Sequence, residues 1–132
     1  MVYNSIQMET KKRVLVVDDE PGILRFVSIS LRLAGYDVTT TTSGEEALQL
    51  VRSAKPDVML LDILMQPMSG FNVLEQLRAF SKMPVIVFTA RREIAEHAVK
   101  RGANGFVAKP FIPEDLVQKL KDVFKTGEET EG

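Results

Sequence analysis

The chain has 132 residues, a formal net charge of −1 and 45% hydrophobic residues, a balance that fits one compact globular domain. The sequence contains no cysteine and one histidine, which excludes disulfides, thiolate metal sites and multi-histidine metal clusters. Its 17 basic residues are scattered, so no nucleic-acid-binding surface is indicated. No apolar run approaches the roughly 20 residues of a membrane helix. The polar N-terminus lacks a secretory signal core, so we expect a cytoplasmic protein without a membrane partner.

Short apolar runs alternate with helical patterns along the chain. The expected strands are the runs at 14–17, 36–40, 58–61, 85–88 and 106–108. The second run is more polar and β-branched than the others, as an edge strand would be. Apolar residues at helical spacing follow each strand, and they begin near residues 21, 43, 71, 94 and 113.

Several residues mark where these helices begin and end. Pro21 suits the first turn of a helix, and Ser43 to Glu46 reads as a capping box. Gly35 and Gly102 are expected to end the first and the fourth helix. The alternation of strand and helix, five times over, predicts a parallel sheet with helices on both faces.

The predicted domain occupies residues 12–125. Residues 1–11 form an N-terminal extension. Residues 126–132 are acidic and contain glycine, which is typical of a disordered tail, a linker remnant or a cloning scar.

Chemically distinctive residues follow four of the five expected strands. Asp18–Glu20 follow the first strand, Asp62 the third, Thr89–Ala90 the fourth and Lys109 the fifth. Ligands of open α/β sheets bind beyond the carboxyl ends of the strands. We therefore expect carboxylates, a hydroxyl and an ammonium to converge on one edge of the sheet.

Each of these residues alone has an ordinary explanation as a helix cap, a turn residue or a solvated charge. Together they do not, because carboxylates about 4 Å apart repel one another by several kcal/mol when poorly solvated. A cation relieves that repulsion, and hard oxygen ligands select Mg²⁺. A carboxylate nucleophile beside a cation, an ammonium and hydrogen-bond donors suits phosphoryl transfer.

Five motifs resemble the receiver domains of response regulators, over roughly residues 12–125. They are Val16–Pro21, Asp62 with Met65 and Gly70, Thr89–Ala90, Gly102–Ala103 and Lys109–Phe111. The resemblance implies a flavodoxin-like, doubly wound, five-stranded parallel sheet of order 2-1-3-4-5 with five helices, as in chemotaxis regulators. It also implies a signalling switch that takes a phosphoryl group from a sensor histidine kinase or a phosphotransfer protein and passes the signal to an unknown effector.

The resemblance assigns a role to each residue of the expected site. Asp62 would accept the phosphoryl group. Asp19, Asp62 and the backbone carbonyl of Leu64 would hold Mg²⁺, with Asp18 helping through water. Lys109 would contact the phosphoryl group, before a cis proline.

Further residues would carry the signal or tune its lifetime. The backbone amide of Ala90 would bind the phosphoryl group. Thr89 would swing toward it and draw Phe106 inward, which would change the face formed by the fourth helix, the fifth strand and the fifth helix. Leu64 and Arg91 would flank the path of the attacking water and slow hydrolysis.

The sequence departs from the family pattern at three places. Gln66 stands where proline is common, and Pro67 follows it. Phe106 stands where tyrosine is frequent. The segment from Gly102 to Phe106 lacks the acidic pair of winged-helix regulators, which weakens the case for a phosphorylation-dependent homodimer but leaves it open.

Two other functions compete with the switch. The first is an aspartyl-phosphate hydrolase, which usually has a second aspartate two residues after the nucleophile, where this chain has Leu64. The second is a flavin carrier on the same fold, whose phosphate the acidic run Asp18–Glu20 would repel.

Overall fold

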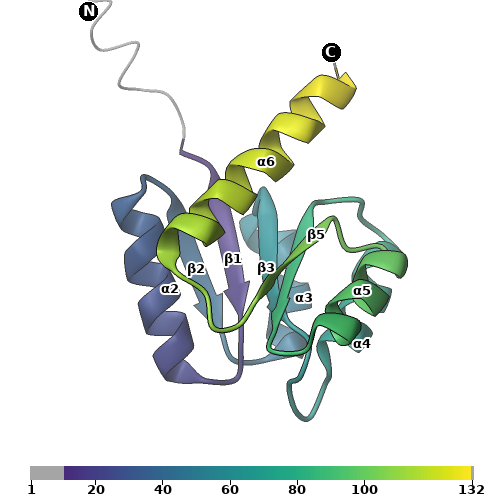
Figure 1. Ribbon diagram of the computed structural model, residues 1–132. Coiled ribbons are helices and arrows are strands. Elements are labelled where there is room, and N and C mark those ends of the chain that lie inside the picture. Colours follow the sequence, from purple (N-terminus) through teal and green to yellow (C-terminus); the bar gives the residue numbers. More distant parts are fainter. Residues whose placement is uncertain (1–10, 132) are drawn as a thin grey trace, which may run out of the picture.

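The computed structural model describes residues 11–131, with side chains up to Thr126. Within this range five strands alternate with five helices (Figure 1). The strands are β1 (Arg13–Val17), β2 (Asp37–Thr41), β3 (Val58–Asp62), β4 (Val85–Thr89) and β5 (Gly105–Ala108). The helices are α2 (Pro21–Leu33), α3 (Gly44–Ala54), α4 (Gly70–Arg78), α5 (Arg92–Lys100) and α6 (Pro113–Glu131).

All strand pairings are parallel, and the order across the sheet is β2-β1-β3-β4-β5. The flavodoxin-like arrangement expected from the sequence is therefore confirmed. β3 and β4 are buried along their whole length, whereas the edge strand β2 is largely exposed. This difference explains why the runs of β3 and β4 are continuously apolar and that of β2 is not.

Two hydrophobic clusters cover the two faces of the sheet. Alternate residues of β1 divide between them, with Leu15 and Val17 in one and Val14 and Val16 in the other. The first cluster includes side chains of α3, α4 and α5, and the second includes side chains of α2 and α6. Figure 1 shows α6 crossing in front of the sheet and α3 behind it. Among the described helices, none combines the length and the apolarity required to cross a bilayer.

The sequence signals at the helix ends mostly act as expected. The Ser43 hydroxyl accepts a hydrogen bond from the Glu46 backbone N–H at 3.1 Å, which caps α3. The Glu46 carboxylate does not complete a capping box, because it accepts a hydrogen bond from the Thr41 hydroxyl instead. Gly35 and Gly102 both have positive φ, at 99° and 115°, and follow α2 and α5.

Two details differ from the sequence expectations. In α2 the buried apolar residues are Leu24, Val27 and Leu31, whereas Phe26, which has the helical spacing of an inward-facing residue, is 45% exposed. Residues 126–132 were expected to be a disordered tail, a linker remnant or a cloning scar, whereas α6 continues to Glu131. Its residues Lys125 to Glu131 extend the helix past the apolar pattern that ends at Phe124. The expected N-terminal extension lies outside the described residues, except for Lys11.

Candidate functional site

An acidic cluster lies at the carboxyl edge of the sheet. Asp18 follows β1 directly and Asp62 is the last residue of β3. These strands are neighbours, with Val17 opposite Leu61, so the sheet order itself brings the two aspartates side by side. One carboxylate oxygen from each of Asp18, Asp19 and Asp62 lies within 4.8 Å of the others. Asp62, which follows Asp19 by 43 positions in the chain, thus joins the two adjacent aspartates in one oxygen-rich site.

Lys109, which follows the edge strand β5, reaches this cluster across the carboxyl edge of the sheet. Its ammonium lies 2.9 Å from Asp18 Oδ2 and 3.8 Å from Asp62 Oδ2. The ammonium also lies 4.9 Å from the ring centroid of Phe88, which borders the lysine from β4. The peptide bond from Lys109 to Pro110 is cis, as the resemblance implied.

Asp18 is the counter-ion of this lysine. Its side chain has no exposed surface, and its second oxygen, Oδ1, accepts a hydrogen bond from the Glu20 backbone N–H at 2.8 Å. Both carboxylate oxygens are therefore engaged by groups of the chain itself. This pairing satisfies a charge that would otherwise be costly to bury.

Asp62 is held less favourably than Asp18. It is only 4% exposed, and its Oδ1 accepts one hydrogen bond, from the Leu64 backbone N–H at 3.2 Å. Burial and then the repulsion of Asp18 raise the pKa of Asp62 to about 6, against the opposing effects of Lys109 and the Leu64 N–H. The carboxylate is consequently more basic than an ordinary aspartate, which favours a role as nucleophile or cation ligand.

The chemistry of this cluster fits a divalent metal ion. All the side-chain donors are carboxylate oxygens, the ligands preferred by Mg²⁺ and Ca²⁺. The cluster holds three carboxylates, and Lys109 pairs with two of them, so a divalent cation would neutralise the charge that Lys109 leaves unbalanced. Asp19 is the member of the cluster that is most accessible to solvent, which leaves room for a partly hydrated ion.

Thr89 and the residues after it border the cluster. Thr89 is the last residue of β4 and is almost completely buried, and its hydroxyl accepts a hydrogen bond from the Arg91 backbone N–H at 3.3 Å. Ala90 is exposed between them. The Arg91 guanidinium, which we expected near the phosphoryl group, lies 3.0 Å from the Glu93 carboxylate in the described structure.

The loop from β3 to α4 shapes the space beside Asp62. The Leu64 side chain is 53% exposed there. Gly70 approaches the end of β3 so closely that a Cβ atom would lie 2.4 Å from the Asp62 carbonyl oxygen. The Gly70 N–H donates to the Ile63 carbonyl at 2.8 Å, and the Gln66–Pro67 bond is cis. A glycine is thus required at position 70 to keep this loop in place.

Two contacts at this edge were not anticipated from the sequence. One is the Phe88 ring beside Lys109. The other is the Arg92 guanidinium, which lies 5.5 Å from the ring centroid of Phe106. Neither carried a sequence signal, because an aromatic residue in a buried strand and an arginine at a helix start are both common on structural grounds alone.

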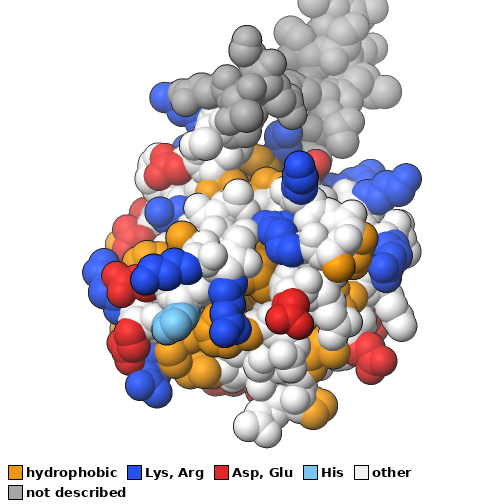
Figure 2. All heavy atoms as spheres, turned by 90° about the vertical axis from the view of Figure 1, so that its right-hand side faces the viewer, with side chains coloured by type: hydrophobic (Ala, Val, Ile, Leu, Met, Phe, Trp, Pro, Cys, Tyr) orange, Lys and Arg blue, Asp and Glu red, His pale blue; other side chains and the backbone are white. Residues whose placement is uncertain are grey.

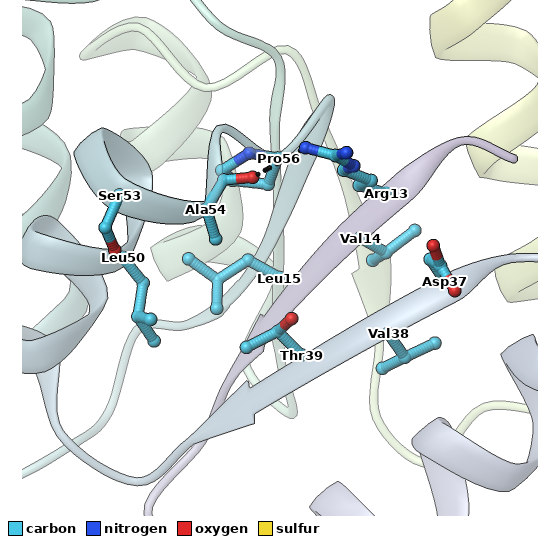
Figure 3. A pocket seen from close by; sticks show the side chains of 10 residues that line it. All are labelled: Arg13, Val14, Leu15, Asp37, Val38, Thr39, Leu50, Ser53, Ala54 and Pro56. Carbon is cyan, nitrogen blue, oxygen red and sulfur yellow. Dashed lines mark hydrogen bonds between the residues drawn. The ribbon is translucent and has the colours of Figure 1, made fainter. Parts of the chain in front are cut away.

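A separate hollow of about 420 Å³ lies at the amino edge of the sheet (Figure 3). Its lining includes the first residues of β1 and β2, Arg13 and Asp37, and the end of α3. The Arg13 guanidinium donates to the Ala54 carbonyl at 3.1 Å, the bond drawn in Figure 3. None of the residues expected to be functional lies in this hollow, so its size does not mark it as the site.

Comparisons with known proteins agree on one family. The profile described as the response regulator receiver domain matches residues 14–121. The chain is 38% identical over 122 residues to the probable transcriptional regulator ycf27 of Guillardia theta, a match that covers 91% of this chain and 48% of that protein. It is 35% identical over 120 residues to the alkaline phosphatase synthesis transcriptional regulatory protein PhoP of Bacillus subtilis (strain 168), covering 89% of this chain and 50% of that protein.

A solved structure gives the same result over nearly its whole length. The chemotaxis response regulator CheY4 of Vibrio cholerae superposes with a TM-score of 0.81 at 36% identity, covering 86% of this chain and 99% of that chain. By contrast, the chain spans about half the length of the two curated relatives.

Proposed function

Because the chain belongs to the family of response regulator receiver domains, we propose that Asp62 is the residue that accepts the phosphoryl group. The observation that carries this proposal is the cluster of Asp18, Asp19 and Asp62, in which the Lys109 ammonium pairs with the two buried members, Asp18 and Asp62. Within it, Asp62 is the carboxylate whose pKa is raised to about 6 and whose oxygens are not both engaged at close range. A free and relatively basic carboxylate oxygen is what a nucleophile at this position needs.

In the proposed reaction an Asp62 oxygen attacks the phosphorus atom of a phosphohistidine on a sensor kinase or phosphotransfer protein. The phosphorus–nitrogen bond breaks, the imidazole leaves with the electron pair, and a phosphorus–oxygen bond forms. Asp19, Asp62 and the backbone carbonyl of Leu64, with help from Asp18, would hold Mg²⁺, which when bound would supply neutralising charge to the transferred group.

The remaining groups of the site bind the other phosphoryl oxygens. The Lys109 ammonium is 3.8 Å from Asp62 Oδ2, close enough to follow a group attached to that carboxylate. The Ala90 backbone N–H and the Thr89 hydroxyl are the proposed donors on the opposite side. When the Thr89 hydroxyl turns toward the phosphoryl group it gives up the hydrogen bond from the Arg91 N–H, and Phe106 moves into the space that it leaves.

The site supports neither competing function. Residue 64 has no titratable side chain, so the position that serves as acid and base in aspartyl-phosphate hydrolases carries a leucine. The acidic run after β1 opposes a flavin phosphate. We propose a cytoplasmic switch that catalyses only its own phosphorylation and dephosphorylation, with a histidine kinase upstream.

The effector is the least defined partner. The two curated relatives are described as transcriptional regulators and are about twice as long as this chain. We therefore propose that each of these relatives joins a receiver domain to an output domain. We also propose a phosphorylation-dependent homodimer. A monomer and a homodimer of the phosphorylated chain differ in solution mass.

Intact mass spectrometry tests the central assignment. The wild-type chain with a small phosphodonor and Mg²⁺ should gain one phosphoryl group, which hydroxylamine removes. Asp62→Asn and an EDTA-treated wild-type sample should gain none. Equal labelling of Asp62→Asn would place the nucleophile elsewhere, and steady release of inorganic phosphate at many turnovers per minute would favour the hydrolase.

A further inference from the structure

Phe106 lies at the boundary between the core and the surface of the molecule. The residue is half-buried, packs against the cluster on the α3, α4 and α5 face, and lines a surface hollow of about 360 Å³ together with Glu96, Val99 and Lys100. Figure 2 shows the side formed by α4, α5 and β5, where Lys and Arg side chains lie beside exposed hydrophobic ones. One side of the ring is therefore accessible at the surface, where neighbouring cations can reach it.

Thr89 and Phe106 project from the same face of the sheet. Phe106 is opposite Val87 in the pairing of β4 with β5, and Thr89 is opposite Ala108. Val87 and Phe106 share one hydrophobic cluster, and Thr89 follows Val87 by two residues, so its side chain points to the same face. Any space released by the Thr89 side chain consequently opens on the side where the Phe106 ring lies.

Arg92 is the cation that contacts this ring. Its guanidinium carbon is 5.5 Å from the Phe106 ring centroid, within the range of a favourable cation–π contact. The neighbouring Arg91 is occupied by Glu93. Among the described side chains, no carboxylate forms an ion pair with Arg92, so the Phe106 ring is the partner that the structure gives its charge.

We propose that Arg92 is a positioning residue of the switch, which holds Phe106 in its outward place and so raises the free energy of the switched state. The inference rests on the proposed function, since it assumes that phosphorylation of Asp62 draws the ring inward. Thr89 and Arg92 lie three residues apart, and the Thr89 hydroxyl accepts a hydrogen bond from the backbone N–H of Arg91, the residue before Arg92 and α5. An inward ring leaves the guanidinium behind in solvent and loses the contact.

A ligand that binds the switched state binds more tightly when the resting state is destabilised, because less binding free energy is spent on the change of state. Removing the contact between Arg92 and Phe106 should therefore tighten the binding of a phosphoryl mimic at Asp62, although position 92 does not contact the mimic.

Beryllofluoride in excess Mg²⁺ is the probe, and its affinity is measured on the full chain. Arg92→Leu should bind it about threefold more tightly than the wild type, which corresponds to about 0.7 kcal/mol. Arg92→Lys keeps a cation and should restore most of the wild-type affinity. Arg101→Leu is the matched control and should leave the affinity unchanged. Arg101 caps the other end of α5 and makes the same kind of contact, with its guanidinium carbon 4.9 Å from the ring centroid of Phe71.

A second background shows whether the effect passes through the ring. In the Phe106→Leu background, the substitution Arg92→Leu should leave the affinity for beryllofluoride almost unchanged, because the ring that Arg92 contacts is absent. In the unliganded Arg92→Leu chain, the aromatic NMR signals of Phe106 should move toward their beryllofluoride-bound positions. Unchanged or weaker binding by Arg92→Leu, or an equal gain in both backgrounds, would overturn the proposal. A wild-type chain that binds no beryllofluoride would contradict the proposed function itself.

Discussion

The two edges of the sheet use charge in opposite ways. At the amino edge, the Arg13 backbone N–H donates to Asp57 Oδ2 at 2.7 Å and its guanidinium donates to a carbonyl, all in contact with solvent. At the carboxyl edge, Asp18 and Asp62 are buried, and the ammonium of Lys109 pairs with these two of the three clustered carboxylates. The first arrangement joins structural elements, whereas the second leaves negative charge unbalanced.

This difference separates a structural contact from a functional one. Exposed charges that are matched contribute little to stability, and their loss is tolerated. Buried charges that are unmatched destabilise the fold unless something binds them, so their presence indicates a ligand. The larger hollow at the amino edge, seen in Figure 3, has no such excess of charge, which is why volume alone is a poor guide here.

Removal of the Lys109 ammonium should have the largest effect on the free energy of unfolding. Without Mg²⁺, Lys109→Met should lower the free energy of unfolding by about 3 kcal/mol, because it strands the fully buried Asp18 without its partner. Arg13→Met at the amino edge should lower it by less than about 1 kcal/mol. Urea denaturation in EDTA measures both, and equal losses would contradict the distinction between the edges.

Metal binding should stabilise the carboxyl edge alone. At a Mg²⁺ concentration about 100 times the Kd, the free energy of unfolding should rise by about 2.7 kcal/mol through mass action. Asp19→Ala should abolish this gain and, by removing a repelling charge, raise the melting temperature of the metal-free chain. Asp37→Ala, at the amino edge, serves as the control and should keep the full Mg²⁺ effect. A wild-type melting temperature that does not respond to Mg²⁺ argues against a formed cation site.

The raised pKa of Asp62 predicts how stability depends on pH in the metal-free chain. Its pKa is raised from 3.8 to about 6, so the unfolded chain releases this proton first and stability falls as the pH rises between these values. Asp62→Asn removes that cost. In EDTA it should raise the free energy of unfolding by about 1.5 kcal/mol near neutral pH, after allowance for solvent screening, and by nothing near pH 4. A gain that is the same at both pH values would show that ionisation is not its cause.

The lifetime of the phosphorylated form should depend on the side chain beside Asp62. Leu64 is half-exposed there and offers no hydrogen bond to orient an attacking water. Leu64→Asn should accelerate dephosphorylation several-fold, worth about 1 kcal/mol in the barrier. Arg91→Ala should accelerate it less, since the Arg91 guanidinium pairs with Glu93 in the resting structure. A phosphoryl half-life that Leu64→Asn leaves unchanged or lengthens would remove the shielding explanation.

Much of this molecule could be predicted from the sequence because its signals are local. The continuous apolar runs gave β3 and β4, and their alternation with helices implied a parallel sheet, whose carboxyl edge had to hold Asp18, Asp62 and Lys109. From the sequence, Mg²⁺ was expected to balance the carboxylates. The ion pair that Lys109 forms with Asp18 was not expected.

What escaped prediction depends on contacts between distant residues or on a helix without a core to face. The Arg92–Phe106 contact joins the start of α5 to β5. Phe26 has the spacing of a buried residue, yet it lies beside Phe111 with its ring centroid 6.2 Å away and remains partly exposed. The end of α6 continues through Gly127 without an apolar pattern, so periodicity could not place it.

The phosphoryl group can be located chemically, which tests the role of Asp62 most directly. Borohydride reduces an aspartyl phosphate to homoserine, so peptide mass spectrometry after phosphorylation and reduction identifies the acceptor. Homoserine is expected at position 62 alone, formed only when Mg²⁺ is present during phosphorylation. Homoserine at position 18 or 19, or its formation at 62 in EDTA to the same extent, would contradict the assignment of the nucleophile and its metal site.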